Sequence, residues 1–435
     1  MRYLFALFIL SVLVGCSLAP APLPPTRLPT PVAEVPALPP RPTATPQPTP
    51  SPAPSPTPTP RSLTLWLSER EPATGELVAL INEAAVSQGL ALKVIVQPAD
   101  ALRLSLATAR LLDEPLPDLI WADQEALAGL LVDGALQPMP ATTGLADALP
   151  ALLTAATLDG QRWGAPISTH NHLFLLYNRD LIETPPATIA DMLALTRARQ
   201  NREVTGLVMA WNEVNWVLPW LHAFGGSLTS PDGQTITLDT PAMTPTLSLL
   251  REMHTASSEG SAGYLRAQRL FAQGYAAMLL DGDWALARYR AVSETLKLGI
   301  APLPRPAGSE RPAVPTLGGT YLMLGATLTG FEREQALALI NAFSTPTVQA
   351  RLVAMGHLPA SQAALALLPA ETDPALLVAA KSAPQAPGLP PTPGVRCARY
   401  GLAVWLPSVY SGRLALDQAP ATMQREAEAC LRRES

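Results

Sequence analysis

Leu63-Thr-Leu-Trp-Leu67 opens the first stretch of this chain that can form a packed core. Between Glu76 and Ser87, apolar residues recur at helical spacing until Gly89 ends the pattern. Two further apolar segments follow, Leu92-Lys-Val-Ile-Val96 and Asp118-Leu-Ile-Trp-Ala122. Short apolar strands that alternate with amphipathic helices are typical of a parallel sheet covered by helices. The sequence therefore predicts an α/β fold.

Polar residues follow the first and the third of these strands. Glu69 and Arg70 come after the first strand, and Asp123 comes after the third. Ligands of open parallel sheets bind beyond the carboxyl ends of the strands, so these residues are candidates for a ligand site. Each also has a structural interpretation. Asp123 can cap the helix that follows it, and Glu69 and Arg70 can lie in a solvated loop.

The composition indicates a well-cored protein with one segment that cannot pack. Of the 435 residues, 48% are hydrophobic and 15% are charged, and the net charge is -5. About 370 residues remain for globular structure after the first sixty or so, which suits two lobes or two domains. Arg432 and Arg433 form the only basic cluster. We therefore expect no binding to nucleic acid.

Residues 1–15 have the features of a signal peptide. Arg2 supplies a positive start, and Leu4 to Val14 form an apolar stretch too short to span a membrane stably. Leu13-Val14-Gly15-Cys16 resembles a bacterial lipobox, in which the signal is cleaved before a cysteine that receives acyl chains. We expect Cys16 to anchor the protein at the extracytoplasmic face of the cell membrane. A secretory signal without lipidation is the alternative.

Residues 16–61 form the expected lipidated N-terminus and linker. Proline, alanine, threonine and serine dominate this segment, which ends in Pro52-Ala-Pro-Ser-Pro-Thr-Pro-Thr-Pro60. Proline favours extended polyproline II, so the segment could reach roughly 100 Å. We interpret it as a spacer between the anchor and the globular body. Partner binding through its Pro-x-Pro spacing is the alternative.

Two cysteines remain after Cys16 is assigned to the leader. They are Cys397 and Cys430, near the end of the chain. Disulfides form and persist in exported proteins, so we expect these two cysteines to be bonded. Buried free thiols are the alternative.

A set of short motifs runs through the globular body: Pro117-Asp-Leu-Ile-Trp-Ala-Asp123, Gly164-Ala-Pro-Ile167, Leu176-Tyr-Asn-Arg-Asp-Leu181, Phe271-Ala-Gln-Gly-Tyr-Ala-Ala-Met278, Asp281-Gly-Asp-Trp284, Gly318-Gly-Thr320 and Ser411-Gly-Arg-Leu-Ala-Leu416. In this order they resemble the extracellular solute-binding proteins of carbohydrate ABC transporters, the family of the maltose-binding protein. The resemblance covers nearly all of residues 62–435. Each motif is weak alone, but the ordered set together with a lipobox is specific.

The resemblance implies a two-lobed, type II periplasmic-binding-protein-like fold with three hinge crossings. It assigns residues 62–168 plus 303–326 to the N-lobe and residues 169–302 plus 327–435 to the C-lobe. It also implies the membrane-anchored substrate-binding component of an ABC importer, which captures a sugar or oligosaccharide in an interlobe cleft and passes it to a permease. Such a protein is a monomer that performs no catalysis and needs no cofactor.

The resemblance also nominates residues that contact the sugar. A pyranose offers one face of C–H groups and a rim of hydroxyls, so its site needs an aromatic surface and polar groups. Trp284 lies at a position where the family places a stacking ring, and Asp123 matches a family carboxylate. Glu69 and Arg70 follow the first strand at a family ligand position. Asn171 replaces a family acid by an amide, which implies a ligand other than maltodextrin.

Further candidates come from a glycine-rich motif and from two tryptophans. Gly318, Gly319 and Thr320 could let the backbone approach a hydroxyl, although glycine can also serve a turn. Trp216 belongs to an aromatic stretch in which some rings face the core and others the cleft. Trp405 lies in a C-terminal segment that often supplies one more stacking ring in the family.

Motifs for other chemistry are missing. His170 and His172 share a strand face and could bind zinc, but a third ligand is not apparent, so we expect no metal. The sequence has no nucleotide-binding loop, nucleophile elbow or metalloprotease helix motif. Two alternatives to an importer component stay open: a surface-anchored solute sensor or adhesion binding protein, and a glycoside hydrolase with a pair of acids.

Overall fold

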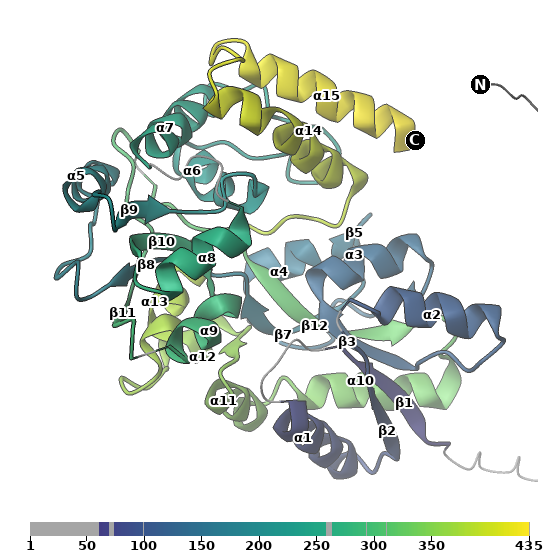
Figure 1. Ribbon diagram of the computed structural model, residues 1–435. Coiled ribbons are helices and arrows are strands. Elements are labelled where there is room, and N and C mark those ends of the chain that lie inside the picture. The colour runs from purple at the N-terminus through teal and green to yellow at the C-terminus, as the bar shows by residue number, and fades with distance from the viewer. Residues whose placement is uncertain are drawn as a thin grey trace, which may run out of the picture. The chain divides into compact units, whose positions relative to one another are not determined.

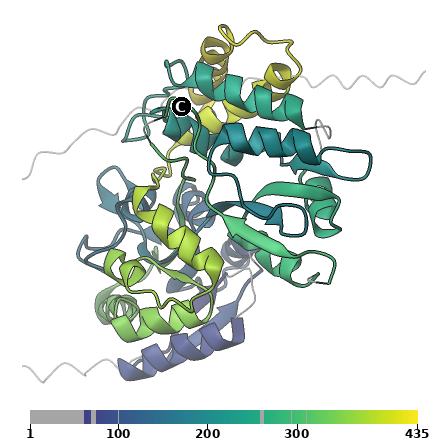
Figure 2. The same cartoon turned by 90° about the vertical axis from the view of Figure 1, so that its left-hand side faces the viewer.

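The computed structural model describes residues 61–68, 74–98, 100–257, 263–292, 294–309 and 311–434 (Figure 1, Figure 2). The predicted signal peptide, Cys16, the linker as far as residue 60, Glu69 and Arg70 lie outside these residues. Within the described ranges, no helix has both the length and the apolar character needed to cross a membrane.

The first sheet contains the three strands predicted from the sequence. In spatial order, its strands are β13 (Leu358–Pro359), β7 (Ala165–His170), β12 (Gly318–Gly325), β3 (Leu119–Asp123), β1 (Leu63–Leu67) and β2 (Leu92–Val96), with β4 (Leu136–Gln137) beside β12. β1 pairs in parallel with both β2 and β3. β12 runs antiparallel to β3 and to β7. The expected parallel α/β arrangement is confirmed for the first three strands.

Successive residues of β1 face opposite sides of this sheet. Leu65 and Leu67 belong to one buried cluster, whereas Trp66 belongs to another. Because strand side chains alternate, an apolar run is buried throughout only where helices cover both faces. The helices around the two clusters are α1 (Thr74–Ser87), α2 (Leu102–Leu111), α3 (Gln124–Val132), α4 (Pro150–Ala155), α10 (Gly330–Ala342) and α11 (Pro346–Ala354) (Figure 1).

A second sheet follows the order β11 (Leu298–Ala301), β8 (Leu173–Asn178), β10 (Ala276–Gly282) and β9 (Thr205–Val208). β8 is antiparallel to β10 and β11, whereas β9 is parallel to β10. The remaining helices are α5 (Ile189–Arg199), α6 (Leu218–Ala223), α7 (Met243–Ala256), α8 (Tyr264–Ala272), α9 (Leu286–Arg290), α12 (Gln362–Ala366), α13 (Pro374–Ser382), α14 (Pro393–Tyr410) and α15 (Ala419–Glu434). Shorter elements are η1 (Val214–Trp216), η2 (Asp283–Ala285), η3 (Ala383–Gln385), β5 (Thr157–Leu158) and β6 (Gln161–Arg162). The fold is the expected two-lobed α/β type.

The lobe to which helices α10 and α11 belong differs from the prediction, which placed residues 327–435 in the C-lobe. Ile340 of α10 and Leu352 of α11 lie in the same buried cluster as Leu65 of β1. β12 ends at Gly325 within the first sheet, and the chain then turns back so that the apolar side of α10 covers that sheet. The segment that contains these two helices therefore packs with the first sheet. The other lobe boundaries stay a prediction.

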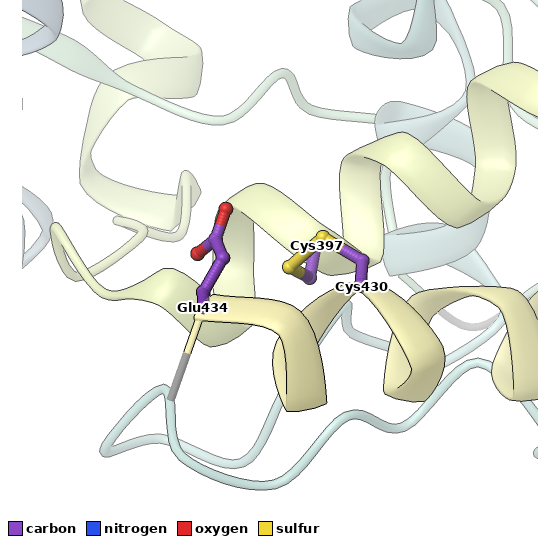
Figure 3. Close-up of side chains that lie close together, drawn as sticks. All are labelled: Cys397, Cys430 and Glu434. Atoms are coloured by element: carbon purple, nitrogen blue, oxygen red, sulfur yellow. A yellow bond between two sulfur atoms is a disulfide. The ribbon is translucent and has the colours of Figure 1, made fainter. Parts of the chain in front are cut away.

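The predicted disulfide between Cys397 and Cys430 is confirmed. It joins α14 to α15 across a sequence separation of 33, with the two Cα atoms 5.5 Å apart (Figure 3). Glu434 lies near the two sulfur atoms, but a sulfur in a disulfide is not a thiolate and does not act as a metal ligand. The Glu434 carboxylate instead accepts a hydrogen bond from Nε of Arg396 at 3.0 Å. The bridge therefore has a structural role.

Candidate functional site

Trp284 lies at the surface, directly after strand β10. Its exposed fraction is 44%, so Trp284 is not a buried core tryptophan. Its indole Nε1 donates a hydrogen bond of 2.6 Å to the hydroxyl of Tyr264. Gly282 makes room for the ring, since a Cβ at that position would lie 2.1 Å from the ring atom Cζ3. The structure thus presents an aromatic surface at the predicted position, and its contact with a sugar stays a prediction.

A buried carboxylate organises the polar groups beneath this indole. Asp281 is 0% exposed and accepts hydrogen bonds from the Tyr264 hydroxyl at 2.9 Å, Gln268 Nε2 at 3.1 Å, the Gly282 N–H at 2.8 Å and the Tyr289 hydroxyl. Burial raises the pKa of Asp281, and the donated hydrogen bonds oppose that shift. A buried carboxylate is tolerated here because several donors satisfy it.

Trp216 supports the exposed indole from the core instead of lining a cleft. Its ring is 4% exposed, and its Nε1 donates to the carbonyl oxygen of Leu280 at 2.8 Å. The ring meets Trp284 edge to face, with centroids 6.0 Å apart, and Tyr264 with centroids 5.8 Å apart. This corrects the expected role of Trp216, because a buried ring cannot offer a face to a solute.

Trp405 is half-buried on α14, where it packs against the core of the second sheet. Its Nε1 atom is buried and has no hydrogen-bond partner among the described residues. The structure does not place this ring in the aromatic cluster of Trp284, Tyr264 and Trp216, and its stacking role stays a prediction.

The candidates on the first sheet lie where β3 and β12 pair. Asp123 and Thr320 are register partners of these strands. One oxygen of Asp123 accepts the N–H of Ala126 at 2.8 Å, so the predicted cap of α3 is present. Thr320 is buried, and a Cβ on Gly319 would lie 2.7 Å from Leu152 Cδ2. Tight packing against Leu152 therefore accounts for a glycine at position 319. Sugar contacts by Asp123, Gly319 and Thr320 stay predictions.

Asn171 forms the turn that leads from β7 of the first sheet into β8 of the second. Its φ of 65° lies in the left-handed region, which asparagine tolerates better than most residues. A Cβ on Gly318 would lie 2.3 Å from the Asn171 amide nitrogen Nδ2. The structure therefore brings together two candidates, Asn171 and the glycine-rich motif of β12, because the absent side chain of Gly318 leaves space for the amide.

The turn that contains Asn171 also contacts the turn that contains Trp284. The N–H of Asp283 donates to the carbonyl oxygen of His172 at 3.0 Å, and the Asp283 carboxylate accepts the N–H of Trp284 at 3.0 Å. Burial raises the pKa of Asp283 to about 6, and the nearby His170 imidazole opposes the shift. Candidates distant in the sequence thus meet on adjacent turns.

His172 is a buried neutral histidine. Its Nε2 lies 2.8 Å from the hydroxyl of Thr169, and its Nδ1 has no hydrogen-bond partner within the described ranges. Burial lowers its pKa to about 3, and the neighbouring His170 contributes. This arrangement suits a structural role for His172 better than a role as a zinc ligand.

Three residues of this cluster were not predicted from the sequence. Asp281 and Asp283 flank Gly282 just before Trp284, and that pattern of acids beside a glycine was a usable signal. Tyr264 had no comparable signal, because α8 brings it to the indole from 20 positions earlier in the chain.

Two open hollows of the described structure do not include the exposed indole. Each has a volume of about 360 Å³; one is lined by residues such as Trp66, Gln97 and Leu104, and the other by residues such as Arg179, Tyr289 and Leu298. Trp284 and Asn171 line neither of them. The candidate site is therefore defined by the aromatic surface and its polar neighbours.

Comparisons with known proteins agree on one family. The maltodextrin-binding protein MdxE of Bacillus subtilis (strain 168) is 26% identical over 211 residues, which cover 45% of this chain and 49% of the relative. A maltooligosaccharide ABC transporter solute-binding lipoprotein of Streptococcus pneumoniae (strain ATCC BAA-255 / R6) is 24% identical over 272 residues, with coverages of 58% and 61%. This chain thus spans from about half to three fifths of the length of these relatives.

A solved structure has the same fold. It is the maltose-binding periplasmic protein MalE of Listeria monocytogenes in complex with maltose, with a TM-score of 0.76, 18% identity, and coverage of 86% of this chain and 98% of that one. The model of the bacterial extracellular solute-binding protein family matches residues 80–378. Because that match extends over most of the globular body, this chain belongs to the bacterial extracellular solute-binding proteins.

Proposed function

We propose that this chain is the membrane-anchored substrate-binding component of an ABC importer and that it captures a neutral sugar or oligosaccharide. The exposed indole of Trp284 carries the proposal, because it offers an apolar ring face of the kind that the C–H face of a pyranose needs. The relatives support a sugar as the class of solute, since their names specify maltodextrin and maltooligosaccharide.

Polar groups beside the indole complete a site for hydroxyls. The Asn171 amide can both donate and accept, and the Asp283 carboxylate accepts. Asp123 adds a carboxylate at the edge of the first sheet. A sugar that binds Asn171, Asp283 and Asp123 would contact residues that adjoin both sheets. If it binds the closed arrangement of the lobes more tightly than the open one, its binding would drive closure.

The proposal includes the anchor and the partner. Acylated Cys16 would hold the protein at the extracytoplasmic face of the membrane, and the proline-rich linker would let a monomeric binding domain reach its permease. The domain binds and releases its solute without chemistry, as the name of its family indicates. A sensor or adhesion protein would bind the same solute but would leave uptake unchanged when deleted.

Titration calorimetry with maltotriose and maltose tests the proposal, with sorbitol as an open-chain control that lacks a ring face. We expect a dissociation constant in the micromolar range or tighter for at least one sugar, roughly -8 kcal/mol, and no heat of binding for sorbitol. Uptake of labelled sugar by cells that lack the gene then separates an importer from a sensor. The proposal fails if a broad panel of sugars gives neither heat nor thermal stabilisation.

A further inference from the structure

We propose that Asp281 is a positioning residue that holds the exposed indole of Trp284 in one orientation through the hydroxyl of Tyr264. The inference rests on the proposed function, because it gives Asp281 and Tyr264 a part in presenting the aromatic surface to the sugar. The three residues come from different elements: Tyr264 from α8, Asp281 from β10 and Trp284 from η2. Asp281 is fully buried, so it acts through Tyr264 and not by touching solute.

The hydrogen bonds between these residues can run in only one direction. An indole N–H only donates, an ionised carboxylate only accepts, and a phenol hydroxyl does both. Trp284 Nε1 donates to Tyr264 at 2.6 Å, and Tyr264 donates to Oδ1 of Asp281 at 2.9 Å. The carboxylate therefore orients the hydroxyl proton, which leaves an oxygen lone pair directed at the indole.

Other donors hold the carboxylate in place. The N–H of Gly282 and the Nε2 of Gln268 donate to Asp281 at 2.8 Å and 3.1 Å, and the Tyr289 hydroxyl donates as well. Arg288 donates to Oε1 of Gln268. Because a guanidinium only donates, this contact directs the amide nitrogen of Gln268 toward Asp281. The carboxylate is thus a fixed anchor for a ring at the surface.

The consequence for binding is a preorganised ring. An indole that is 44% exposed can rotate about its side-chain torsions unless other groups restrain it. The bond to Tyr264 uses the only polar atom of the indole, and Trp216 packs against the indole in an edge-to-face contact. A ring already held in its binding orientation loses less conformational entropy when the sugar arrives. Trp284 therefore offers the sugar a ring face and not its N–H.

Tyr264→Phe and Tyr289→Phe form a matched pair of variants. Each removes one hydroxyl that donates to Asp281 and keeps the aromatic ring, but only Tyr264 also accepts from Trp284. With ¹⁵N-labelled tryptophan in the full chain, the Trp284 indole signal is assigned by its loss in Trp284→Phe. We expect this signal to move upfield and to exchange faster with solvent in Tyr264→Phe, and to keep its wild-type position in Tyr289→Phe.

This readout needs no ligand, so it decides the inference separately from the proposed function. An indole signal that is unchanged in Tyr264→Phe, or that changes equally in both variants, overturns the positioning role. Failure of every sugar in the panel to bind would count against the proposed function, while the indole signal would still decide the inference.

Affinity provides the second measurement. We expect Tyr264→Phe to raise the dissociation constant of maltotriose about two- to tenfold, the range set by one net hydrogen bond, and Tyr289→Phe to leave it nearly unchanged. Equal affinities in the two variants, despite a displaced indole signal, would show that orientation of the ring does not affect binding.

Substitutions of Asp281 test the anchor itself. Asp281→Asn keeps one oxygen that can accept from Tyr264, whereas Asp281→Ala removes both oxygens. We expect the Trp284 signal of Asp281→Asn to lie closer to the wild-type position than that of Asp281→Ala. Equal displacement in the two variants would contradict an acceptor role for the carboxylate. If Asp281→Ala does not fold, the tyrosine pair still decides the inference.

Discussion

Gly282 and Trp284 fit together only because position 282 has no Cβ. An added Cβ would lie 2.1 Å from Cζ3 and 2.2 Å from Cη2 of the indole ring, closer than carbon atoms approach without a shift. Trp284 is 44% exposed, so its ring can swing away from a methyl group. The glycine therefore controls the position of the aromatic surface more than the packing of the core.

Gly282→Ala is expected to displace the indole and break its bond to Tyr264. The free energy of unfolding should fall by about 1 kcal/mol, the net value of one hydrogen bond. The free energy of binding to maltotriose should change by more than that. Gly75→Ala is the matched control, because a Cβ there meets no atom within 4 Å. Denaturant melts and calorimetry make the comparison. Wild-type affinity in Gly282→Ala would contradict the assigned place of the ring.

Trp284→Ala is expected to lower the affinity for the sugar by one to two decades. Removing a large ring from the contact costs about 1.5 to 3 kcal/mol. The free energy of unfolding should fall by only about 1 kcal/mol, the net value of the lost bond to Tyr264, because Trp284 is 44% exposed. Tyr275→Ala is the control, since this 53% exposed residue precedes the far end of β10. A large loss of stability with unchanged affinity in Trp284→Ala would refute the stacking role.

Acidification is expected to destabilise the protein through His172. Its folded-state pKa is lowered to about 3, below the ordinary value of 6.5, so the unfolded state binds a proton that the folded state excludes. Its contribution to stability is complete above pH 6.5 and is lost as the pH falls toward 3. The loss should reach about 2 kcal/mol at pH 5. Denaturant melts of His172→Gln should show a shallower dependence on pH between 6.5 and 5, and an unchanged slope would contradict the assignment.

Asp283 is expected to act in the opposite direction. Its folded-state pKa is raised to about 6, above the ordinary value of 3.8, so the folded state takes up the proton first as the pH falls. Its contribution to stability is complete below pH 3.8 and is lost as the pH rises through 6. Asp283→Asn should therefore be more stable than wild type at pH 7.5 and should steepen the loss of stability on acidification. Melts at pH 7.5 and 5 check both signs.

Loss of the bridge between Cys397 and Cys430 is expected to destabilise the C-terminal helix pair. Replacing both cysteines by alanine should lower the free energy of unfolding by about 3 to 4 kcal/mol on the loop-entropy model. Reductant provides the control: it should destabilise the wild type and leave the double variant unchanged. Equal melts of wild type and double variant would rule out a stabilising role for the bridge.

Cys16→Ser is expected to release the protein from membranes of a bacterial host that acylates lipoproteins. Lipidation is the only membrane anchor that we infer for this chain, and each buried methylene of an acyl chain contributes about 0.8 kcal/mol. Fractionation followed by immunoblotting measures the effect, with Ser17→Ala as the neighbouring control. Retention of Cys16→Ser in the membrane fraction would contradict the lipid anchor.

Local patterns in the sequence determined the fold class and several details of the site. Strands 63–67 and 92–96 have the predicted bounds. The first is a mostly buried apolar run, whereas the second is an edge strand in which Lys93 and Val96 are exposed. Asp123 caps the helix that begins at the next residue, which is a relationship within one turn. The cysteine pair was predictable because an exported chain offers few other roles for two cysteines.

Only the tertiary structure decided which aromatic residues of the candidate site are exposed and which are buried. Trp216 and Trp284 are the same residue type in similar short 3₁₀ elements, yet one is 4% and the other 44% exposed. The partnership of Trp284 with Tyr264, and the packing of α10 on the first sheet, depend on where distant parts of the chain meet. Helical and strand periodicity constrains neighbours within a few residues, whereas contacts across 20 or more positions follow from burying all the apolar faces together.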